Sequence, residues 1–129
     1  MKKILIVDDE PGFTRLLKLT LEKIGGYEVM EENDGTHAWE RAREFKPDLI
    51  LLDIVMPRID GGDVASQLKS DWTLKHIPIV FLTAIVSKRE AVLGGLIGGY
   101  PFISKPVSLD DLVRCIEENL AKASIVQHE

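Results

Sequence analysis

Uninterrupted apolar runs alternate along the chain with amphipathic segments. Residues 4–7, 49–52 and 79–82 carry only apolar side chains, which is typical of strands buried on both faces of a parallel sheet. Residues 27–30 are interrupted by Glu28 and lead into an Asn-Asp-Gly turn, which predicts an exposed edge strand. A last, short strand is expected around Phe102 and Ile103. The pattern therefore predicts five strands.

Apolar residues recur at intervals of three and four positions between these strands, which predicts amphipathic helices. Five helices are expected: from Pro11 to the glycines that follow Ile24, over residues 38–45, after Asp60, from Lys88 to about Ile97, and from Leu109 to Leu120. The fourth contains glycines, each of which costs about 1 kcal/mol relative to alanine, so we expect it to be short. Residues 124–129 carry no periodic signal and are expected to form a C-terminal tail after a domain of residues 1–123.

Strands and helices that alternate in this way predict an α/β fold with right-handed parallel crossovers and helices on both faces of the sheet. The edge character of the second strand and the apolar character of the first, third and fourth favour a flavodoxin-like, doubly wound five-stranded sheet in the order 2-1-3-4-5. In such a sheet the ligand site lies beyond the carboxyl ends of the strands, where the strand order reverses.

Acidic residues follow two of the apolar runs directly. Asp8, Asp9 and Glu10 come after the run at residues 4–7, and Asp53 comes after the run at residues 49–52. We interpret Glu10 as an acid that the dipole at a helix N-terminus stabilises, and we expect the other three carboxylates to converge. Because crowded carboxylates repel one another, a hard divalent cation such as Mg²⁺ is the expected partner.

Composition narrows the class of protein. A chain of 129 residues with 45% hydrophobic content fits one compact domain. The formal net charge of −5 argues against direct binding of nucleic acid, which draws on clustered Lys and Arg. The single cysteine, Cys115, allows no internal disulfide and fits a reducing, cytoplasmic location. No segment approaches the roughly 20 apolar residues of a membrane span.

The residues at the strand ends resemble those of a known family, the receiver domains of two-component response regulators. Asp8 and Asp9 resemble the acidic metal-binding pair of that family, and Asp53 resembles its phosphoacceptor. Thr83, after the fourth strand, resembles the hydroxyl residue that senses the phosphoryl group, and Lys105, which precedes a proline, resembles the family's lysine. The resemblance covers nearly the whole chain and is in register with its strand ends.

This resemblance implies a function. Asp53 would accept a phosphoryl group from a histidine kinase or a histidine phosphotransfer protein. Mg²⁺ or Mn²⁺ would be held by Asp8, Asp9, Asp53 and the backbone carbonyl of Val55, while Lys105 would offset negative charge. The domain would be regulatory and no enzyme, although it would assist its own phosphorylation and dephosphorylation. Its output would be a change in the surface of the fourth helix, the fifth strand and the last helix, read by a downstream protein effector.

Two features of this sequence bear on that output. Thr83 and Phe102 are the expected switch residues, and because Phe102 has no hydroxyl, its part in the switch would be steric. Val55 and Ile85 are expected to border the path of the water that hydrolyses the phosphorylated aspartate. Neither side chain can orient or deprotonate water, so the phosphorylated state is expected to be long-lived.

Two other classes of function are considered. The chain could be a receiver-like adaptor that is never phosphorylated. It could also be a phosphatase with an aspartyl nucleophile, but that class places a second Asp two residues after the first-strand nucleophile, where this chain has Glu10. A flavodoxin that binds flavin fits less well, because the loop after the first strand is acidic. No DNA-binding motif follows Leu120, so we expect either a stand-alone receiver or part of a longer protein.

Overall fold

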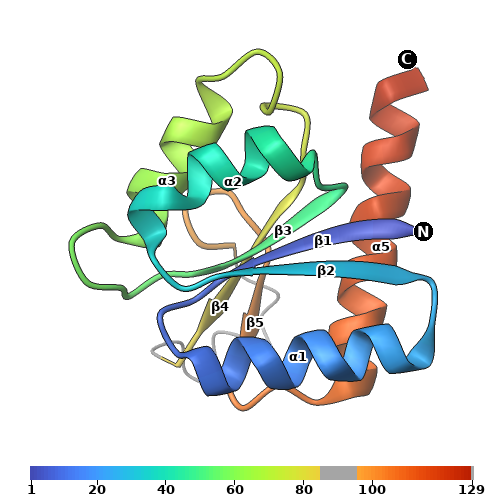
Figure 1. The fold of residues 1–129 in the computed structure, drawn as a ribbon. Helices are drawn as coiled ribbons and strands as arrows, with labels where there is room; N and C mark the ends of the chain where they lie inside the picture. Colours follow the sequence, from blue (N-terminus) through green and yellow to red (C-terminus); the bar gives the residue numbers. More distant parts are fainter. Residues whose placement is uncertain (85–95, 129) are drawn as a thin grey trace.

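The architecture is that of a parallel sheet between two layers of helices (Figure 1). A computed structural model describes residues 1–84 and 96–128. The sheet has the order β2-β1-β3-β4-β5 and every neighbouring pair is parallel, as the sequence predicted. Its strands are β1 (Lys2–Val7), β2 (Tyr27–Glu32), β3 (Leu49–Asp53), β4 (Ile79–Thr83) and β5 (Phe102–Ser104). The helices are α1 (Pro11–Ile24), a 3-10 turn at Gly35–His37, α2 (Ala38–Phe45), α3 (Gly61–Lys69) and α5 (Leu109–His128).

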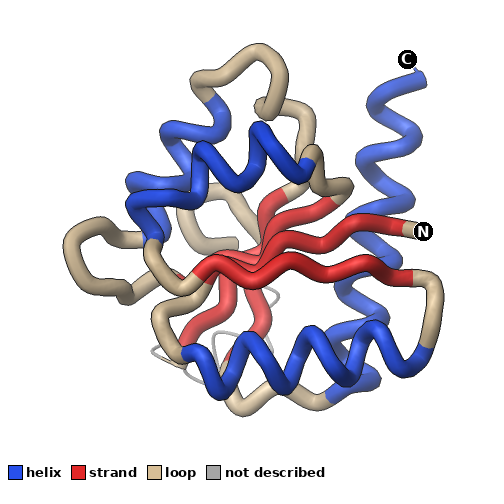
Figure 2. The backbone as a smooth tube through the Cα atoms, viewed as in Figure 1, coloured by secondary structure: helices blue, strands red, loops and turns tan. Residues whose placement is uncertain are grey.

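Successive residues of the central strands divide between two apolar cores, because side chains on a strand alternate between its faces. In β1, Leu5 and Val7 pack with α2 and α3, whereas Ile4 and Ile6 pack with α1 and α5. Figure 2 shows these two pairs of helices on opposite faces of the sheet. All five residues of β3 are buried, and so are all five of β4, which explains the uninterrupted apolar runs at residues 49–52 and 79–82.

A close approach at Gly61 fixes α3 against the end of β3. A Cβ added at Gly61 would lie 2.4 Å from the carbonyl oxygen of Asp53 and 2.8 Å from the Cα of Ile54. The amide of Gly61 also donates a hydrogen bond of 2.7 Å to the carbonyl of Ile54. Asp60 caps the helix, since its side chain accepts a hydrogen bond from the amide of Asp63. The start of α3 therefore packs directly on the backbone that carries Asp53.

Two expected elements differ from those observed. The part of the chain that the structure describes contains four α-helices, because most of the helix expected from Lys88 to Ile97 lies outside the described residues. Its expected last residue, Ile97, forms a bridge with Tyr100 and is not helical. At the other end, the segment expected to be a tail is helical as far as His128. No glycine or proline follows Leu120 to stop α5, and Ala121 and Ala123 favour helix. A domain boundary near residue 123 stays a prediction.

No helix among the residues described is both long and apolar enough to cross a membrane.

Gly61→Ala is expected to destabilise the fold by about 2 kcal/mol, because the added methyl group overlaps backbone that cannot move aside. Gly12→Ala is the matched control: Gly12 lies in the first turn of α1, and a Cβ there would meet nothing within 4 Å. Urea denaturation of the two variants measures the difference. Equal free energies of unfolding would show that the β3–α3 junction yields to the extra methyl group.

Candidate functional site

Three carboxylates meet at the carboxyl end of the sheet. Asp8 directly follows β1, Asp53 ends β3, and the two strands are neighbours with Val7 opposite Leu52. Oxygen atoms of Asp8, Asp9 and Asp53 all lie within 4.8 Å of one another. Asp8 is fully buried, Asp53 is 6% exposed and Asp9 is half-buried. The convergence expected from the sequence is confirmed, and the cluster could hold a metal ion.

Lys105 brings a positive charge to this cluster from the loop after β5. Its Nζ lies 2.7 Å from Asp8 Oδ2, 3.8 Å from Asp53 Oδ1 and 3.8 Å from Glu10 Oε1. Its backbone amide donates a hydrogen bond of 2.8 Å to the carbonyl of Thr83, which ties the lysine loop to the end of β4. Burial lowers the pKa of Lys105, but the hydrogen bond to Asp8 and the nearby carboxylates outweigh it and raise the pKa. The lysine is therefore charged.

The pKa of Asp53 is raised to about 6. Burial is the largest cause, the charge of Asp8 is the next, and the Lys105 ammonium acts in the opposite direction. One lysine therefore does not fully offset three carboxylates. In the absence of a further cation, the ionised form of Asp53 is costly.

Three other candidate residues lie on β4, on β5 and in the loop after β3. Thr83 is buried at the end of β4, and Phe102 is half-buried at the start of β5, where it packs against the core shared by α2 and α3. The Val55 side chain is 61% exposed, two residues beyond Asp53. Ile85, the other residue expected to border the path of water, lies outside the described residues.

Glu10 lies at the helix N-terminus expected for it and also contacts the acidic cluster. It occupies the N-cap position of α1, but its side chain makes no capping hydrogen bond. Instead its backbone amide donates to Asp8 Oδ1 at 3.0 Å, and its carboxylate faces Lys105. Glu10 thus helps to orient Asp8 and belongs to the electrostatic surroundings of the cluster.

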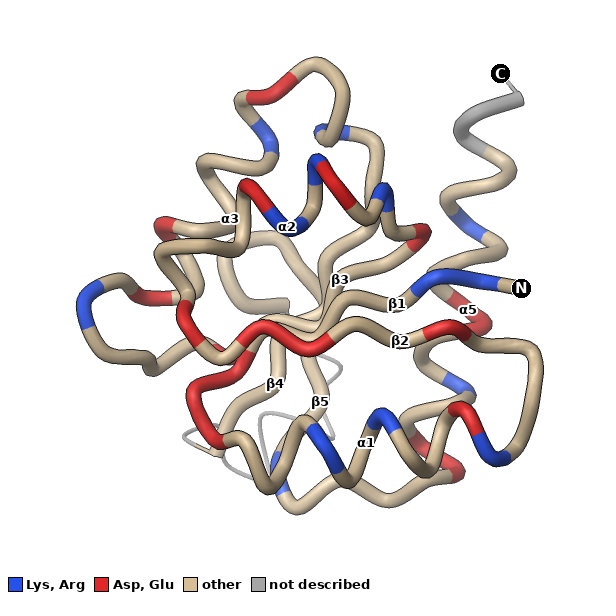
Figure 3. The backbone as a smooth tube through the Cα atoms, in the orientation of Figure 1, with Lys and Arg blue, Asp and Glu red and all other residues tan. Residues whose placement is uncertain are grey.

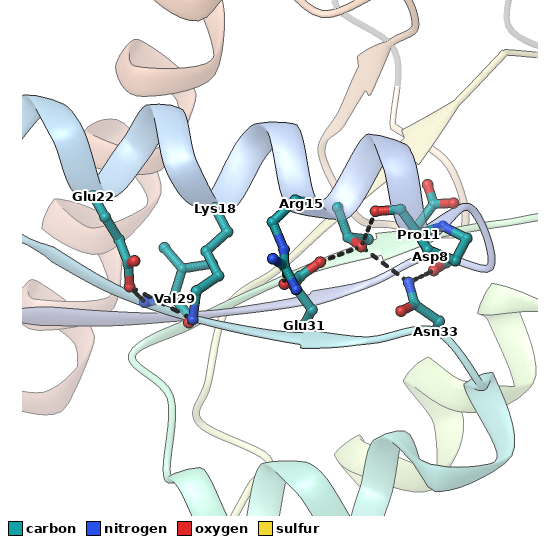
Figure 4. Close-up of polar contacts among 9 residues, drawn as sticks. Asp8, Pro11, Arg15, Lys18, Glu22, Val29, Glu31 and Asn33 are labelled. Carbon is teal, nitrogen blue, oxygen red and sulfur yellow. Dashed lines mark hydrogen bonds and ion pairs between the residues drawn. The ribbon is translucent and has the colours of Figure 1, made fainter.

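Sequence reasoning missed a polar network next to the acidic pair (Figure 4). Asn33 Nδ2 donates to the carbonyl oxygen of Asp8 at 2.7 Å and to Thr14 Oγ1 at 3.0 Å. Thr14 Oγ1 lies 2.7 Å from Glu31 Oε1. One signal was available: Thr14 shares the helical spacing of the buried residues Leu17 and Leu21, so a polar side chain stands on the apolar face of α1.

Acids gather at the ends of β1 and β2 (Figure 3). Three acids at or just beyond the end of β2 are paired with arginines from α1, α2 and the loop after β3. Arg15 of α1 lies 3.0 Å from Glu31, and Arg41 of α2 lies 2.9 Å from Glu32. Arg58, in the loop after β3, lies 2.6 Å from Asp34. These pairs lie at the β2 edge of the sheet, whereas Lys105 is a cation next to the central cluster of Asp8, Asp9 and Asp53.

The fold and site together define a doubly wound α/β domain with an acidic site at the switch point of its strand order. Comparison with known families narrows this class. The family model described as "Response regulator receiver domain" matches residues 4–117. The chain belongs to the response regulator receiver domain family, whose members are regulatory domains of two-component signalling systems.

Individual relatives agree with this assignment. The chain is 37% identical over 124 residues to the alkaline phosphatase synthesis transcriptional regulatory protein PhoP of Bacillus subtilis, covering 96% of this chain and 50% of that protein. It is 36% identical over 124 residues to the polar-differentiation response regulator DivK of Brucella anthropi, covering 95% of this chain and 98% of DivK. The chain thus spans about half the length of several relatives that it matches and nearly all of others.

Solved structures show the same fold. Chemotaxis protein CheY4 of Vibrio cholerae superposes with a TM-score of 0.79 at 28% identity, covering 92% of this chain and 98% of that one. The BeF3-activated N-terminal receiver domain of Klebsiella pneumoniae RstA superposes with a TM-score of 0.77 at 32% identity, covering 92% and 98% of the two chains. The resemblance seen in the sequence is confirmed.

Asp53→Asn is expected to stabilise the metal-free protein at about pH 7.5 by about 1–3 kcal/mol. A pKa raised to about 6 means that the native state binds the proton of Asp53 more tightly than the unfolded chain. The stability that this proton confers is full below about pH 4, the pKa of an unfolded-state Asp, and is lost as the pH rises through about 6. The gain from Asn should therefore shrink as the pH falls to about 4.

Urea denaturation in a chelator at both pH values measures this gain. Asp110→Asn, which changes an exposed acid in the first turn of α5, is the control and should give no gain at either pH. A gain from Asp53→Asn that is absent at neutral pH, or equal at both pH values, would contradict the raised pKa.

Proposed function

We propose that the chain is a phosphoryl acceptor in two-component signalling, that Asp53 is the residue phosphorylated, and that the donor is a phosphohistidine of a histidine kinase or a phosphotransfer protein. The observation that supports this most directly is the cluster of Asp8, Asp9 and Asp53 with Lys105 at its edge, in a chain of the receiver family. Receiver domains interact with histidine kinases and effectors in general, and a cytoplasmic location fits such partners.

In this proposal Mg²⁺ or Mn²⁺ is held by the carboxylates of Asp8, Asp9 and Asp53 and by the backbone carbonyl of Val55. Oxygen donors crowded within 4.8 Å of one another and still short of positive charge fit such an ion. When bound, the ion neutralises negative charge on the oxygens of the transferred phosphoryl group. The surroundings of Asp8 also fit a metal ligand. The Glu10 amide donates a hydrogen bond to Asp8 Oδ1 and Lys105 Nζ donates one to Asp8 Oδ2, which keeps the carboxylate oriented.

Asp53 supplies the nucleophile. One of its carboxylate oxygens forms a bond to phosphorus while the bond from phosphorus to the donor imidazole breaks, and the imidazole takes up a proton after it leaves. Lys105, whose Nζ lies 3.8 Å from Asp53 Oδ1, can turn on its flexible stem toward the incoming phosphoryl oxygens. The domain therefore takes part in its own phosphorylation and acts as a regulatory element, with no separate substrate to turn over.

The output is proposed to pass through Thr83 and Phe102. Thr83 ends β4 beside the strand that carries Asp53, and Phe81 of the same strand lies opposite Phe102 of β5. A shift of Thr83 toward the new phosphoryl oxygens would change the packing around Phe102, which is half-buried. A downstream protein effector would read that change on the surface of β5, α5 and the fourth helix expected from the sequence.

The central test is intact mass after incubation with a small-molecule phosphodonor and Mg²⁺. Wild type should gain one phosphoryl group, and Asp53→Asn and Asp9→Ala should gain none, because the first lacks the nucleophile and the second lacks a metal ligand. Chelation of the metal should abolish the gain as well. A folded wild-type protein that is never phosphorylated would favour the adaptor, and turnover of phosphomonoesters would favour the phosphatase.

Loss of the phosphoryl group is expected to be slow in wild type and at least about tenfold faster in a Val55→Asn, Ile85→Glu double variant, because polar side chains there can position the attacking water. Decay of the phosphorylated protein, followed by mass, measures both rates. Leu19→Asn is a matched control, since Leu19 is as exposed as Val55 (58% and 61%) but lies on α1. Unchanged decay in the double variant would show that access of water is controlled elsewhere.

A further inference from the structure

The hydrogen bonds around Thr14 have one arrangement that satisfies every group. A threonine hydroxyl has one hydrogen to donate, and an ionised carboxylate can only accept. Thr14 Oγ1 lies 2.7 Å from Glu31 Oε1 and 3.2 Å from the carbonyl of Pro11, so the hydrogen goes to Glu31. The lone pairs of Thr14 are then left to accept from Asn33 Nδ2, 3.0 Å away.

The amide of Asn33 is fixed in consequence. Its nitrogen carries two hydrogens, of which one goes to Thr14 and the other to the carbonyl oxygen of Asp8 at 2.7 Å. Thr14 is fully buried. The Glu31 side chain is 15% exposed, and its second oxygen is held by Arg15 at 3.0 Å. The network therefore runs from the surface of α1 through buried groups to the backbone of Asp8.

The carbonyl held by Asn33 belongs to the peptide unit that joins Asp8 to Asp9. The amide of Asp8 is held as well, because it donates to the carbonyl of Glu32 at 3.1 Å. Both backbone groups of Asp8 are thus tied to the end of β2, one by the strand and one by the Asn33 side chain. Figure 4 shows Asn33 reaching across from β2 to this point. The direction in which Asp9 leaves the strand depends on that peptide plane.

We propose that Asn33 and Thr14 are positioning residues for the divalent-cation site: they set the Asp8–Asp9 peptide so that both carboxylates face Asp53. Neither residue would touch the ion or the phosphoryl group. The inference rests on the proposed function, because it concerns the same ion. Polar groups that orient metal ligands from behind typically change metal affinity by about 10–100-fold when they are removed.

A merely structural role predicts a different outcome. Removing a buried hydroxyl that has a partner destabilises a protein wherever it lies, so lower stability alone does not distinguish the two roles. A positioning role predicts that the affinity for Mg²⁺ falls further than it does in a variant that loses similar stability by a change away from the site. Tyr27→Phe provides the comparison. Tyr27 is a buried residue at the start of β2, at the opposite end of that strand from Asn33, and its hydroxyl donates to Glu117.

The experiment measures the Mg²⁺ dissociation constant by titration calorimetry and the free energy of unfolding in a chelator. Asn33→Ala and Thr14→Val should each weaken Mg²⁺ binding about tenfold. The double variant should bind Mg²⁺ little more weakly than the single variant of lower affinity, because both changes break the same chain of hydrogen bonds. Thr14→Ser, which keeps the hydroxyl, should bind Mg²⁺ within about twofold of wild type. Tyr27→Phe should lose stability and keep its Mg²⁺ affinity.

Mg²⁺ affinity that stays within about twofold of wild type in both Asn33→Ala and Thr14→Val would overturn the inference, and so would a Tyr27→Phe affinity that falls as far as theirs. If Thr14→Val fails to fold, Asn33→Ala decides, since its side chain is only half-buried. Failure of the proposed function has another signature: wild type would gain no phosphoryl group in the intact-mass test, whatever its affinity for Mg²⁺.

Discussion

Repulsion among three carboxylates at one end of the sheet is the constraint on which the rest of this molecule depends. Asp8, Asp9 and Asp53 have oxygens within 4.8 Å of one another. Burial and the charge of Asp8 together raise the pKa of Asp53 against the opposing effect of Lys105. Such a cluster survives in a folded protein because burial elsewhere supplies the stability. The two apolar cores on the faces of β1, β3 and β4 supply it, and they keep the three carboxylates together despite their repulsion.

The same cores make the site geometrically definite. Parallel strands buried on both faces leave little freedom at their ends, and the loops that follow are held from several sides. Gly61 lets α3 pack on the carbonyl of Asp53, Asn33 holds the carbonyl of Asp8, and the amide of Lys105 bonds to Thr83. Each tie joins a charged residue to a neighbouring strand or helix. The side chains of the site are therefore positioned through contacts of their own backbone with neighbouring strands and helices.

Much of this could be predicted from the sequence, since apolar runs mark buried strands and acids at their ends mark a site. Asp8, Asp9 and Asp53 were expected to converge and do so, because strand register brings the strand ends together whatever the loops do. Lys105 was expected beside them from the resemblance to receiver domains, and its Nζ lies there. The role of Asn33 was not found, because a residue in an Asn-Asp-Gly turn has an adequate local explanation and its partner Thr14 lies on another element. The helix through residues 124–128 was missed because α5 continues on intrinsic propensity, beyond the apolar stripe that periodicity detects.

The arginines around β2 give this end of the sheet two kinds of positive charge. Three acids at or just beyond the end of β2 are each held by the guanidinium of Arg15, Arg41 or Arg58. A guanidinium keeps its charge at any physiological pH and binds carboxylates in a fixed geometry. At the centre stands Lys105, a point charge on a flexible stem. The acids at the end of β2 thus have partners of fixed charge and geometry, whereas the cation that offsets part of the charge of the central cluster can turn away. Among the described residues, a divalent cation arriving from solvent would therefore meet exchangeable positive charge at the cluster of Asp8, Asp9 and Asp53.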